Sequence, residues 1–434
     1  MKQRKRSVLL FTVLACVLAL SACGSNGGNG KTGNGAEGDS GNTGSGKEIR
    51  LNVSTNVVGE QAKVLQEITE RFMEENPDIK VDFSAPGKEY ENMMKVKMAS
   101  SDMPDVFATH GWAKQRYGEF LEDLSGEAWA AEISEAIKPS VADESGKVYV
   151  LPMDQDKSGP TYNVDILNEY GIEVPSTYEE LLAACEIIKT KSGGKVIPIH
   201  IGGADAWPLG QFLDFFATPL LISAETNEGE ALLNGTFDWN KFDVLPQMLK
   251  DLQDKGYLNK DVLTSKYSDS AKAFAEGKAA FTVIGPYFIE EAQKINPELK
   301  GGLMPIPSIV PGDTATFAGG EKTTWGVWNK SKNMEAAKKY VAYFAKPENI
   351  TLVAKSNQLP PGLNGVDIDA GQLTEYYEKY KDTRVLPYFD RVYLPNGMWD
   401  VMCKNGQDLL SGGITAREYS ENMKKEFERL KVAN

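Results

Sequence analysis

Cysteine and histidine are scarce in this sequence of 434 residues, which contains four cysteines and two histidines. The histidines, His110 and His200, are far apart, and there is neither an HExxH motif nor a pair of CxxC motifs. Structural and catalytic zinc sites are built from such clusters, so the scarcity argues against a zinc enzyme. We expect no metal site and no cofactor.

Basic residues are also in deficit, since 47 Lys and Arg oppose 61 Asp and Glu and the net charge is -14. Nucleic-acid binding needs clustered cations that neutralise phosphates, so nucleic acid is not an expected partner. The composition, 41% hydrophobic and 25% charged, is typical of a soluble globular protein. At about 100 to 200 residues per domain, the length predicts two or three folding units, and we expect two lobes.

A single long apolar run, residues 8–20, follows four cations near the N-terminus. It is short for a membrane span and has the layout of an export signal. The run ends in Leu20-Ser21-Ala22-Cys23, which resembles the lipobox of bacterial lipoproteins. We expect residues 1–22 to be removed and Cys23 to carry the lipid, with palmitate among its acyl chains. An ordinary secretory peptide with an incidental cysteine is the alternative.

The residues after Cys23, up to position 46, are mostly Gly, Ser, Asn and Thr. None is large enough to build a core, so 23–46 is predicted to be a lipidated cysteine and flexible tether. An anionic body would be held at the membrane by the anchor and not by its charge. We therefore expect the protein on the extracellular face of the cell membrane.

Two cysteines, Cys185 and Cys403, remain in the body. They could pair, because an exported protein meets an oxidising compartment. Cys185 lies on an apolar helical face with Leu181 and Ile188, however, and a buried free thiol suits that position better.

Hydrophobic periodicity predicts secondary structure at the start of the body. Residues 49–54, 79–83 and 105–108 have the pattern of strands, and residues 60–75 and 89–99 that of helices. This β-α-β-α-β order predicts a mostly parallel sheet covered by helices, and therefore an α/β fold. Further along, Ser176 and Glu179 have the spacing of a capping box at the start of a helix over 178–189.

Short motifs then follow one another in a fixed order. They are Met103-Pro104-Asp105-Val106-Phe107, Gly146-Lys147-Val148-Tyr149-Val150-Leu151-Pro152, Tyr162-Asn163-Val164-Asp165, Phe274-Ala275-Glu276-Gly277-Lys278, Gly285-Pro286-Tyr287, Gly319-Gly320 and Asn333-Met334-Glu335-Ala336-Ala337. In this order, and behind a lipobox and tether, they resemble the extracellular solute-binding proteins of bacterial ABC importers. The resemblance is to the sugar-binding group that includes maltose-binding protein.

The resemblance implies a type II periplasmic-binding-protein-like fold, with two hinge-linked α/β lobes and a ligand cleft between them. On that template lobe 1 comprises residues 47–155 and 322–360, and lobe 2 comprises residues 157–320 and 362–434. The crossings between the lobes would lie near 154–158, 319–322 and 360–362.

Aromatic residues are the first candidates for a sugar site, because aromatic rings cover the C–H faces of sugars. Five of them lie within two residues of Gly or Pro in loops or at element ends, namely Trp112, Trp207, Tyr287, Trp325 and Trp399. Trp207, Tyr287 and Trp399 also fall where the maltose-binding relatives carry stacking aromatics. Core packing is the alternative for each of them.

Polar candidates would bind the hydroxyl rim of a sugar. Asp154 and Asp156 imitate the start of a calcium loop, but the twelfth place lacks the required Glu, so we expect hydroxyl acceptors there. Glu321 at another crossing is a similar candidate. His110, after a predicted strand, is a ligand or a structural histidine. Glu60 is a ligand or favours the helix dipole.

These observations predict a monomeric, membrane-tethered binding protein that captures an oligosaccharide and delivers it to the permease of an ABC importer, without catalysis. The alternative is a secreted, membrane-anchored glycoside hydrolase, which would also use aromatics and two carboxylates but would shorten its ligand. A surface adhesin or sensor is a third possibility, separable by sugar uptake after the protein is removed.

Overall fold

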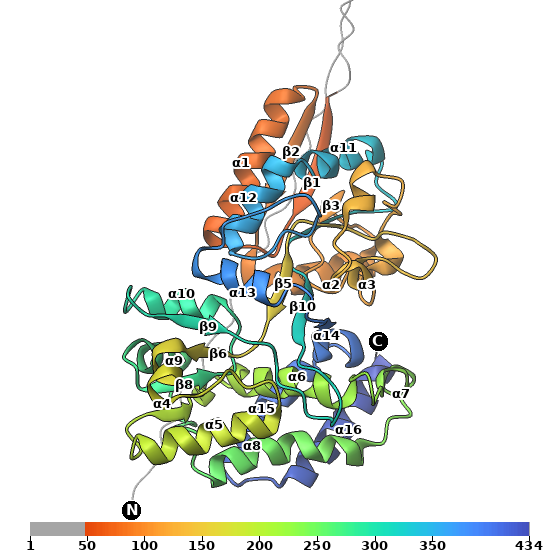
Figure 1. Ribbon diagram of the computed structural model, residues 1–434. Coiled ribbons are helices and arrows are strands. Elements are labelled where there is room, and N and C mark those ends of the chain that lie inside the picture. The colour runs from red at the N-terminus through yellow and green to blue at the C-terminus, as the bar shows by residue number, and fades with distance from the viewer. Residues whose placement is uncertain (1–47, 434) are drawn as a thin grey trace, which may run out of the picture. The chain divides into compact units, whose positions relative to one another are not determined.

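Buried hydrophobic side chains form two large clusters in the computed structural model, which describes residues 48–433. One cluster draws on residues 51–153 and 325–353 together with Leu363, and the other on residues 162–318 and 370–427. Each cluster is the core of one lobe, and the lobes are the upper and lower halves of the ribbon in Figure 1. The chain therefore leaves and re-enters each lobe, as the resemblance implied.

The first lobe contains a five-stranded sheet in the order β2-β1-β3-β11-β4. β1 pairs in parallel with β2 and β3, and β11 is antiparallel to β3 and β4, so the predicted β-α-β-α-β start is confirmed. The elements of this lobe are β1 (Ile49–Ser54), α1 (Gly59–Glu75), β2 (Ile79–Ser84), η1 (Gly87–Glu89), α2 (Tyr90–Ser100), β3 (Val106–Phe107), η2 (Gly118–Phe120), η3 (Ala128–Glu132), α3 (Lys138–Val141), β4 (Leu151–Pro152), β11 (Thr324–Val327), α11 (Met334–Phe344) and α12 (Pro347–Asn357).

The second lobe contains a four-stranded sheet in the order β7-β8-β6-β9, covered by helices. Its elements are β6 (Thr161–Asn163), α4 (Val164–Tyr170), α5 (Tyr178–Lys191), β7 (Ile197–Ile199), η4 (Gly203–Asp205), α6 (Trp207–Leu221), α7 (Gly229–Asn234), η5 (Trp239–Asp243), α8 (Val244–Asp254), α9 (Tyr267–Ala275), β8 (Ala279–Thr282), α10 (Tyr287–Gln293), β9 (Gly301–Leu303), η6 (Gly371–Leu373), α13 (Thr374–Lys379), α14 (Phe389–Tyr393), α15 (Met398–Leu410) and α16 (Ala416–Ala433).

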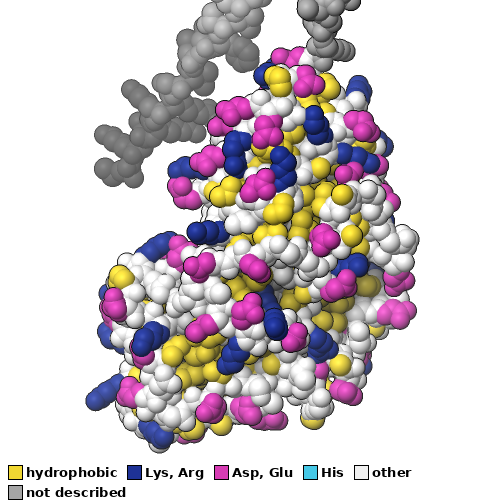
Figure 2. Space-filling view, turned by 45° about the horizontal axis from the view of Figure 1, so that its top comes forward, with side chains coloured by type: hydrophobic (Ala, Val, Ile, Leu, Met, Phe, Trp, Pro, Cys, Tyr) yellow, Lys and Arg dark blue, Asp and Glu magenta, His cyan; other side chains and the backbone are white. Residues whose placement is uncertain are grey.

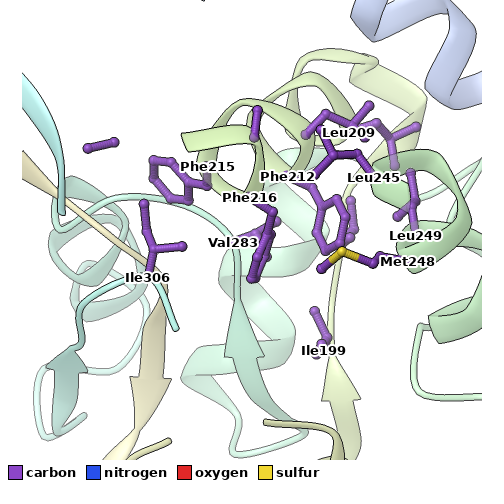
Figure 3. Packing of buried hydrophobic residues seen from close by; sticks show 14 of the residues in the cluster. Ile199, Leu209, Phe212, Phe215, Phe216, Leu245, Met248, Leu249, Val283 and Ile306 are labelled. Carbon is purple, nitrogen blue, oxygen red and sulfur yellow. The ribbon is translucent and has the colours of Figure 1, made fainter. Parts of the chain in front are cut away.

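Helix α6 is the centre of the second core. Its Phe212, Phe215 and Phe216 are fully buried. Figure 3 shows Phe212 on the side of Leu245, Met248 and Leu249 of α8, and Phe215 on the opposite side, toward Ile306. Such burial all round is expected of a helix that is apolar on every face. One charged residue, Asp214, is nevertheless completely buried in this helix.

The start of α5 corrects one local prediction. The capping box is formed by Thr177 and Glu180, one residue later than the predicted pair Ser176 and Glu179. The Thr177 hydroxyl accepts a hydrogen bond from the Glu180 backbone N–H at 3.2 Å, and the Glu180 carboxylate accepts from the Thr177 N–H at 3.2 Å. Ser176 donates its hydroxyl to the same carboxylate, so both residues of the Ser-Thr pair are engaged.

Three extended segments link the lobes. β5 (Gln155–Ser158) runs antiparallel to β10 (Phe317–Glu321), which pairs in parallel with β12 (Val385–Pro387), and Figure 1 shows β5 and β10 passing between the lobes. A Cβ on Gly319 would lie 1.8 Å from the Asp156 carbonyl oxygen, so only glycine allows this close pairing. The third linking segment lies near Pro360, after α12. It runs beside β5, since the Gln155 N–H donates to the Pro360 carbonyl at 2.9 Å.

No helix within residues 48–433 combines the length and the apolar character needed to cross a membrane. Cys185 and Cys403 are both free and buried, which confirms the free-thiol interpretation of Cys185. Cys23 and the predicted tether lie outside the described residues. On the face shown in Figure 2, acidic and basic side chains are interspersed over both lobes.

Candidate functional site

A cavity of about 1020 Å³ lies between the two lobes and is the candidate ligand site. Its size is at the upper end of the range in which small molecules bind. The first lobe contributes Glu91, Lys95, Met98, Trp112, Gln115, Arg116, Glu119 and Phe120. The linking strands contribute Asp156 and Lys322, and the second lobe contributes Gln211, Asp214, Tyr287, Tyr388, Asp390, Arg391, Leu394, Pro395, Asn396, Gly397, Trp399, Asp400 and Lys431.

Four of the residues predicted from the sequence line this cavity. Trp112 comes from the loop after β3, Asp156 from β5, Tyr287 from the first turn of α10 and Trp399 from the first turn of α15. Segments that are far apart in the chain therefore bring three aromatic side chains and one carboxylate to a single cavity. Aromatic faces and carboxylate oxygens are complementary to the faces and hydroxyl rim of a sugar.

Arg391 of α14 reaches across the cavity from the second lobe to the first. Its guanidinium carbon lies 5.4 Å from the centre of the Trp112 ring and 4.4 Å from that of Tyr388. A Cβ on Gly111 would lie 2.5 Å from the guanidinium, and Gly111 has a φ of +87°, so a glycine is needed at this position. The guanidinium presents several N–H donors close to two rings.

The polar centre of the cavity includes Asp214 and Asp390. The Asp390 N–H donates to Asp214 Oδ1 at 2.8 Å, while Asp214 Oδ2 is buried without a hydrogen-bond partner in the described part of the chain. Burial, and then the neighbouring Asp390 carboxyl, raise the pKa of Asp214 well above its ordinary value. The neutral acid is therefore favoured, and a neutral carboxyl group can both donate and accept a hydrogen bond.

Asp156 lies on β5, one of the strands that link the lobes, and lines the cavity. It accepts hydrogen bonds from the Ser158 hydroxyl at 2.6 Å and from the Tyr388 hydroxyl at 3.0 Å. Lys322 Nζ lies 3.9 Å from its Oδ2. The residue is only 6% exposed, so a ligand would reach it through the cavity.

Arg116, in the loop after β3, makes one hydrogen bond within the first lobe and one to the second lobe. Arg116 donates to the Glu91 carboxylate at 2.5 Å and to Asn396 Oδ1 of the second lobe at 3.3 Å. Its guanidinium also covers the Trp112 ring at 3.8 Å. One face of Trp112 is therefore occupied by a cation in this structure.

His110 is partly exposed and does not line the cavity. Its Nδ1 is 3.0 Å from Glu91 Oε1, and its ring packs edge-on against Trp112 with centroids 5.2 Å apart. Burial lowers the pKa of His110. Its position supports the structural alternative, because His110 holds two residues that do line the cavity.

Asp154 and Glu321 are buried near the linking strands and do not line the large cavity. Asp154 accepts from the Thr323 N–H at 2.7 Å, from the Thr323 hydroxyl at 3.0 Å and from the Asn357 amide at 2.5 Å. Burial raises the pKa of Asp154 to about 6 and that of Glu321 to about 7. Glu321 accepts from the Ala113 N–H at 3.3 Å.

Glu60, Trp207 and Trp325 lie elsewhere. Glu60 is exposed and pairs with Lys63 at 2.5 Å. Trp207 packs against Tyr267 with ring centroids 5.2 Å apart. Trp325 is completely buried in the first core, which assigns it to packing.

Sequence reasoning missed several residues that line the cavity, above all Asp214, Tyr388, Asp390 and Arg391. One signal was present, because Asp214 is the sole charged residue in the otherwise apolar run of α6. The other three come from one short segment, residues 388–391, which carries no pattern of periodicity. Within residues 48–433 no group of His, Cys, Asp and Glu is arranged to hold a metal ion.

Comparisons with known proteins identify the family. The family model described as bacterial extracellular solute-binding protein matches residues 57–351. The chain is 40% identical over 379 residues to the melibiose/raffinose/stachyose-binding protein MelE of Bacillus subtilis, covering 87% of this chain and 89% of the relative.

Two solved structures are similar over nearly the whole described chain. A binding protein of B. subtilis in an open conformation matches with a TM-score of 0.86 and 38% identity, covering 89% of this chain and 98% of that one. A sugar transporter of Bacillus licheniformis in complex with stachyose matches with a TM-score of 0.75 and 41% identity, covering 88% and 100%. This chain belongs to the bacterial extracellular solute-binding protein family.

Proposed function

We propose that the protein captures an oligosaccharide in the cavity between its lobes and delivers it to the permease of an importer. The observation that carries this proposal is the lining of the cavity, which combines aromatic rings with carboxyl groups and a guanidinium. The apolar faces of a neutral sugar pack on the aromatic rings, and its hydroxyl groups form hydrogen bonds with the carboxyl groups and the guanidinium. The family match supports the same conclusion.

Each part of the lining has a role in this proposal. Tyr287 and Trp399 stack on sugar rings, while Asp156 accepts hydrogen bonds from hydroxyl groups. Asp214 has one oxygen without a partner in the described residues and exchanges hydrogen bonds with a hydroxyl in its neutral form. Arg391 donates to ring or hydroxyl oxygens of the same sugar.

The relatives suggest which sugars are bound. MelE is named for melibiose, raffinose and stachyose, and the B. licheniformis protein was crystallised with stachyose. These di-, tri- and tetrasaccharides share a terminal galactosyl group. We infer that the present chain binds the same series, with the shared galactosyl group held at the acidic centre of the cavity.

The lobes are expected to close on the ligand. Apart from the third crossing, the two main cores support a first lobe of residues 47–155 and 322–360 and a second of 157–320 and 362–434. Leu363 packs with the first core, so we place the third crossing a few residues later than 360–362. The TM-score is higher with the open relative than with the stachyose complex, at nearly equal identity, and this is consistent with an open starting state.

A glycoside hydrolase is the alternative that composition alone left open. The proteins of this family and the relatives found are binding proteins. Capture without turnover is therefore expected, and sugar recovered after long incubation should have its original length.

Calorimetric titration with melibiose, raffinose and stachyose tests the proposal. We expect each to bind at one site per chain, and maltose, which lacks a galactosyl group, to bind more weakly. Mass spectrometry of the recovered sugars checks that they are intact. If none of the three galactosides bound, or if they were shortened, the proposed function would be wrong.

We also propose that the mature protein begins at a lipid-bearing Cys23, is monomeric and works with membrane permease subunits. The support is the Leu20-Ser21-Ala22-Cys23 motif and the polar tether behind it. The parent chain should fractionate with membranes, and Cys23→Ala should move to the soluble fraction. Equal membrane retention of both forms would contradict the lipid anchor.

A further inference from the structure

Arg391 lines the cavity without a carboxylate partner. Within residues 48–433 its guanidinium makes neither a hydrogen bond nor an ion pair, although Asp156, Asp214 and Asp390 are its acidic neighbours. Arginine side chains that recognise carboxylates are commonly fixed by bidentate pairs with them. The side chain of Arg391 is therefore held in another way.

Two aromatic rings, one from each lobe, lie beside the Arg391 guanidinium. Its central carbon is 4.4 Å from the centre of the Tyr388 ring and 5.4 Å from that of the Trp112 ring. Both distances are within the range of cation–π contacts, which extends to about 6 Å. Tyr388 belongs to the same short segment as Arg391, whereas Trp112 lies in the loop after β3 of the first lobe. The contact with Trp112 therefore crosses the cleft.

A guanidinium held by rings keeps its hydrogen-bonding edge free. A cation–π contact uses the face of this planar group, whereas its N–H bonds point outward in the plane. A carboxylate partner would have occupied some of these donors. The contacts with Tyr388 and Trp112 orient Arg391 and leave its donors available to the oxygens of a ligand.

The backbone beside Trp112 is shaped to receive Arg391. A Cβ on Gly111 would lie 2.5 Å from Arg391 Nη1, 3.1 Å from its Cδ and 3.3 Å from its Cζ. The arginine therefore passes directly over the glycine that precedes Trp112. The φ of Gly111 is +87°, a conformation that suits glycine. Glycine at this position lets the guanidinium come close to the Trp112 ring.

Other protein groups already surround the Trp112 ring. The Arg116 guanidinium lies 3.8 Å from its centre, and the His110 ring packs against it with centroids 5.2 Å apart and an interplanar angle of 84°. Trp112 also packs against the first core. A sugar that stacks on a ring needs an open aromatic face. With Arg391 as a further neighbour, the surroundings of Trp112 suit a ring that holds a cation.

We propose that Trp112 is a positioning residue, which holds the Arg391 guanidinium from across the cleft and so sets where this donor meets the sugar, and that Trp112 does not itself stack on the sugar. This inference rests on the proposed function, because it assumes that Arg391 donates to a bound sugar. Tyr388 holds the same guanidinium from the second lobe. The donor is therefore in place only when both lobes contribute a ring.

A double-mutant cycle on melibiose binding, measured by calorimetry, tests the inference. Trp112→Leu should weaken binding about tenfold in the parent chain, because the guanidinium loses a ring that orients it. In an Arg391→Met background the same change should alter the affinity by less than about twofold, since no guanidinium remains to be positioned. A ring that stacks on the sugar would cost the same factor in both backgrounds.

A measurement on the ligand-free protein keeps the test decisive if Arg391→Met binds melibiose too weakly to titrate. Because Trp112 and Arg391 join the lobes, small-angle scattering should give a larger radius of gyration for ligand-free Trp112→Leu than for the parent. A ring that only stacks on a sugar would leave this radius unchanged. Trp328→Leu is the matched control, because Trp328 is also partly buried against the first core but does not line the cavity. It should match the parent in both measurements.

Thermal unfolding shows whether each variant is folded. Should Trp112→Leu fail to fold, Trp112→Phe takes its place in the cycle, with an expected loss of about threefold because Phe binds cations less strongly than Trp. Equal losses in both backgrounds, or parent-like binding by the Trp112 variant, would overturn the inference. Where the cycle cannot be titrated, an unchanged radius of the ligand-free variant would do so. Failure of the parent to bind melibiose, raffinose and stachyose would instead contradict the proposed function itself.

Discussion

Asp214 offers the sharpest test of the cavity's polar centre. It is completely buried, accepts the Asp390 N–H through Oδ1, and leaves Oδ2 without a partner in the described residues. Because burial raises its pKa, we expect the residue to be a neutral acid near pH 7. Asparagine keeps an acceptor for the Asp390 N–H and adds a neutral donor, so Asp214→Asn should mimic the protonated side chain.

The expected binding follows from this comparison. Asp214→Asn should bind melibiose within about threefold of the parent at pH 7. Asp214→Leu leaves a buried sugar hydroxyl without a partner in the complex, and an unsatisfied buried group costs about 1–3 kcal/mol. Its affinity should therefore fall about tenfold or more. If Asp214→Asn lost affinity as severely as Asp214→Leu, the ligand would require a charged carboxylate, and our reasoning on protonation would fail.

Stability provides an independent check with a defined sign. A carboxyl group whose pKa is raised on folding stabilises the native state below its unfolded pKa, and this contribution is lost as pH rises toward the folded pKa. Each unit of upward shift corresponds to about 1.4 kcal/mol. Asparagine does not titrate, so the free energy of unfolding of Asp214→Asn relative to the parent should rise between pH 4 and 8. Denaturant titrations across this range measure it, and a flat difference would contradict a buried neutral acid.

Other predictions concern the rings and the closure of the lobes. Trp399→Ala should lose about 1–3 kcal/mol of sugar binding with little effect on folding, and Tyr287→Ala should behave in the same way. Trp325→Ala, a control at a fully buried residue, should instead lose about 3–5 kcal/mol of stability. If Trp399→Ala or Tyr287→Ala lost stability and kept sugar binding, that ring would belong to the core and not to the site. Small-angle scattering should show a smaller radius of gyration with saturating stachyose, and an unchanged radius would count against hinge closure.

The secondary structure and the fold were predictable where hydrophobic residues repeat at the spacing of a helix or a strand and where short motifs follow one another in a family's order. The strand at 49–54 and the helix over 60–75 repeat apolar residues at the spacing of their elements, and the structure places both within one or two residues. The start of α5 was displaced by one residue because Ser176 and Thr177 can both serve as caps. Sequence pattern cannot decide between adjacent residues of equal capping ability.

The site was less predictable, because a residue lines a cavity when its side chain points into it, and residue type alone does not show where a side chain points. Trp325 and Trp399 both lie within two residues of a glycine, yet the first is in a core strand and the second is at a helix start and lines the cavity. Asp390 and Arg391 follow a three-residue strand that has no alternating pattern. Their position is fixed by the pairing of β12 with β10, a contact between segments almost seventy residues apart.

The buried Asp154 shows how a residue can matter to a site without touching a ligand. Thr323 and Asn357 line a cavity of about 300 Å³ beside the linking segments. Both residues donate hydrogen bonds to the Asp154 carboxylate. These residues belong to separate segments of the chain, so one carboxylate ties the second and third linking regions to the first. A carboxylate suits this position because its two oxygens accept several hydrogen bonds at once. The side chains that a ligand meets beside the linking segments are therefore oriented by a carboxylate that lies behind them and does not itself line the large cavity.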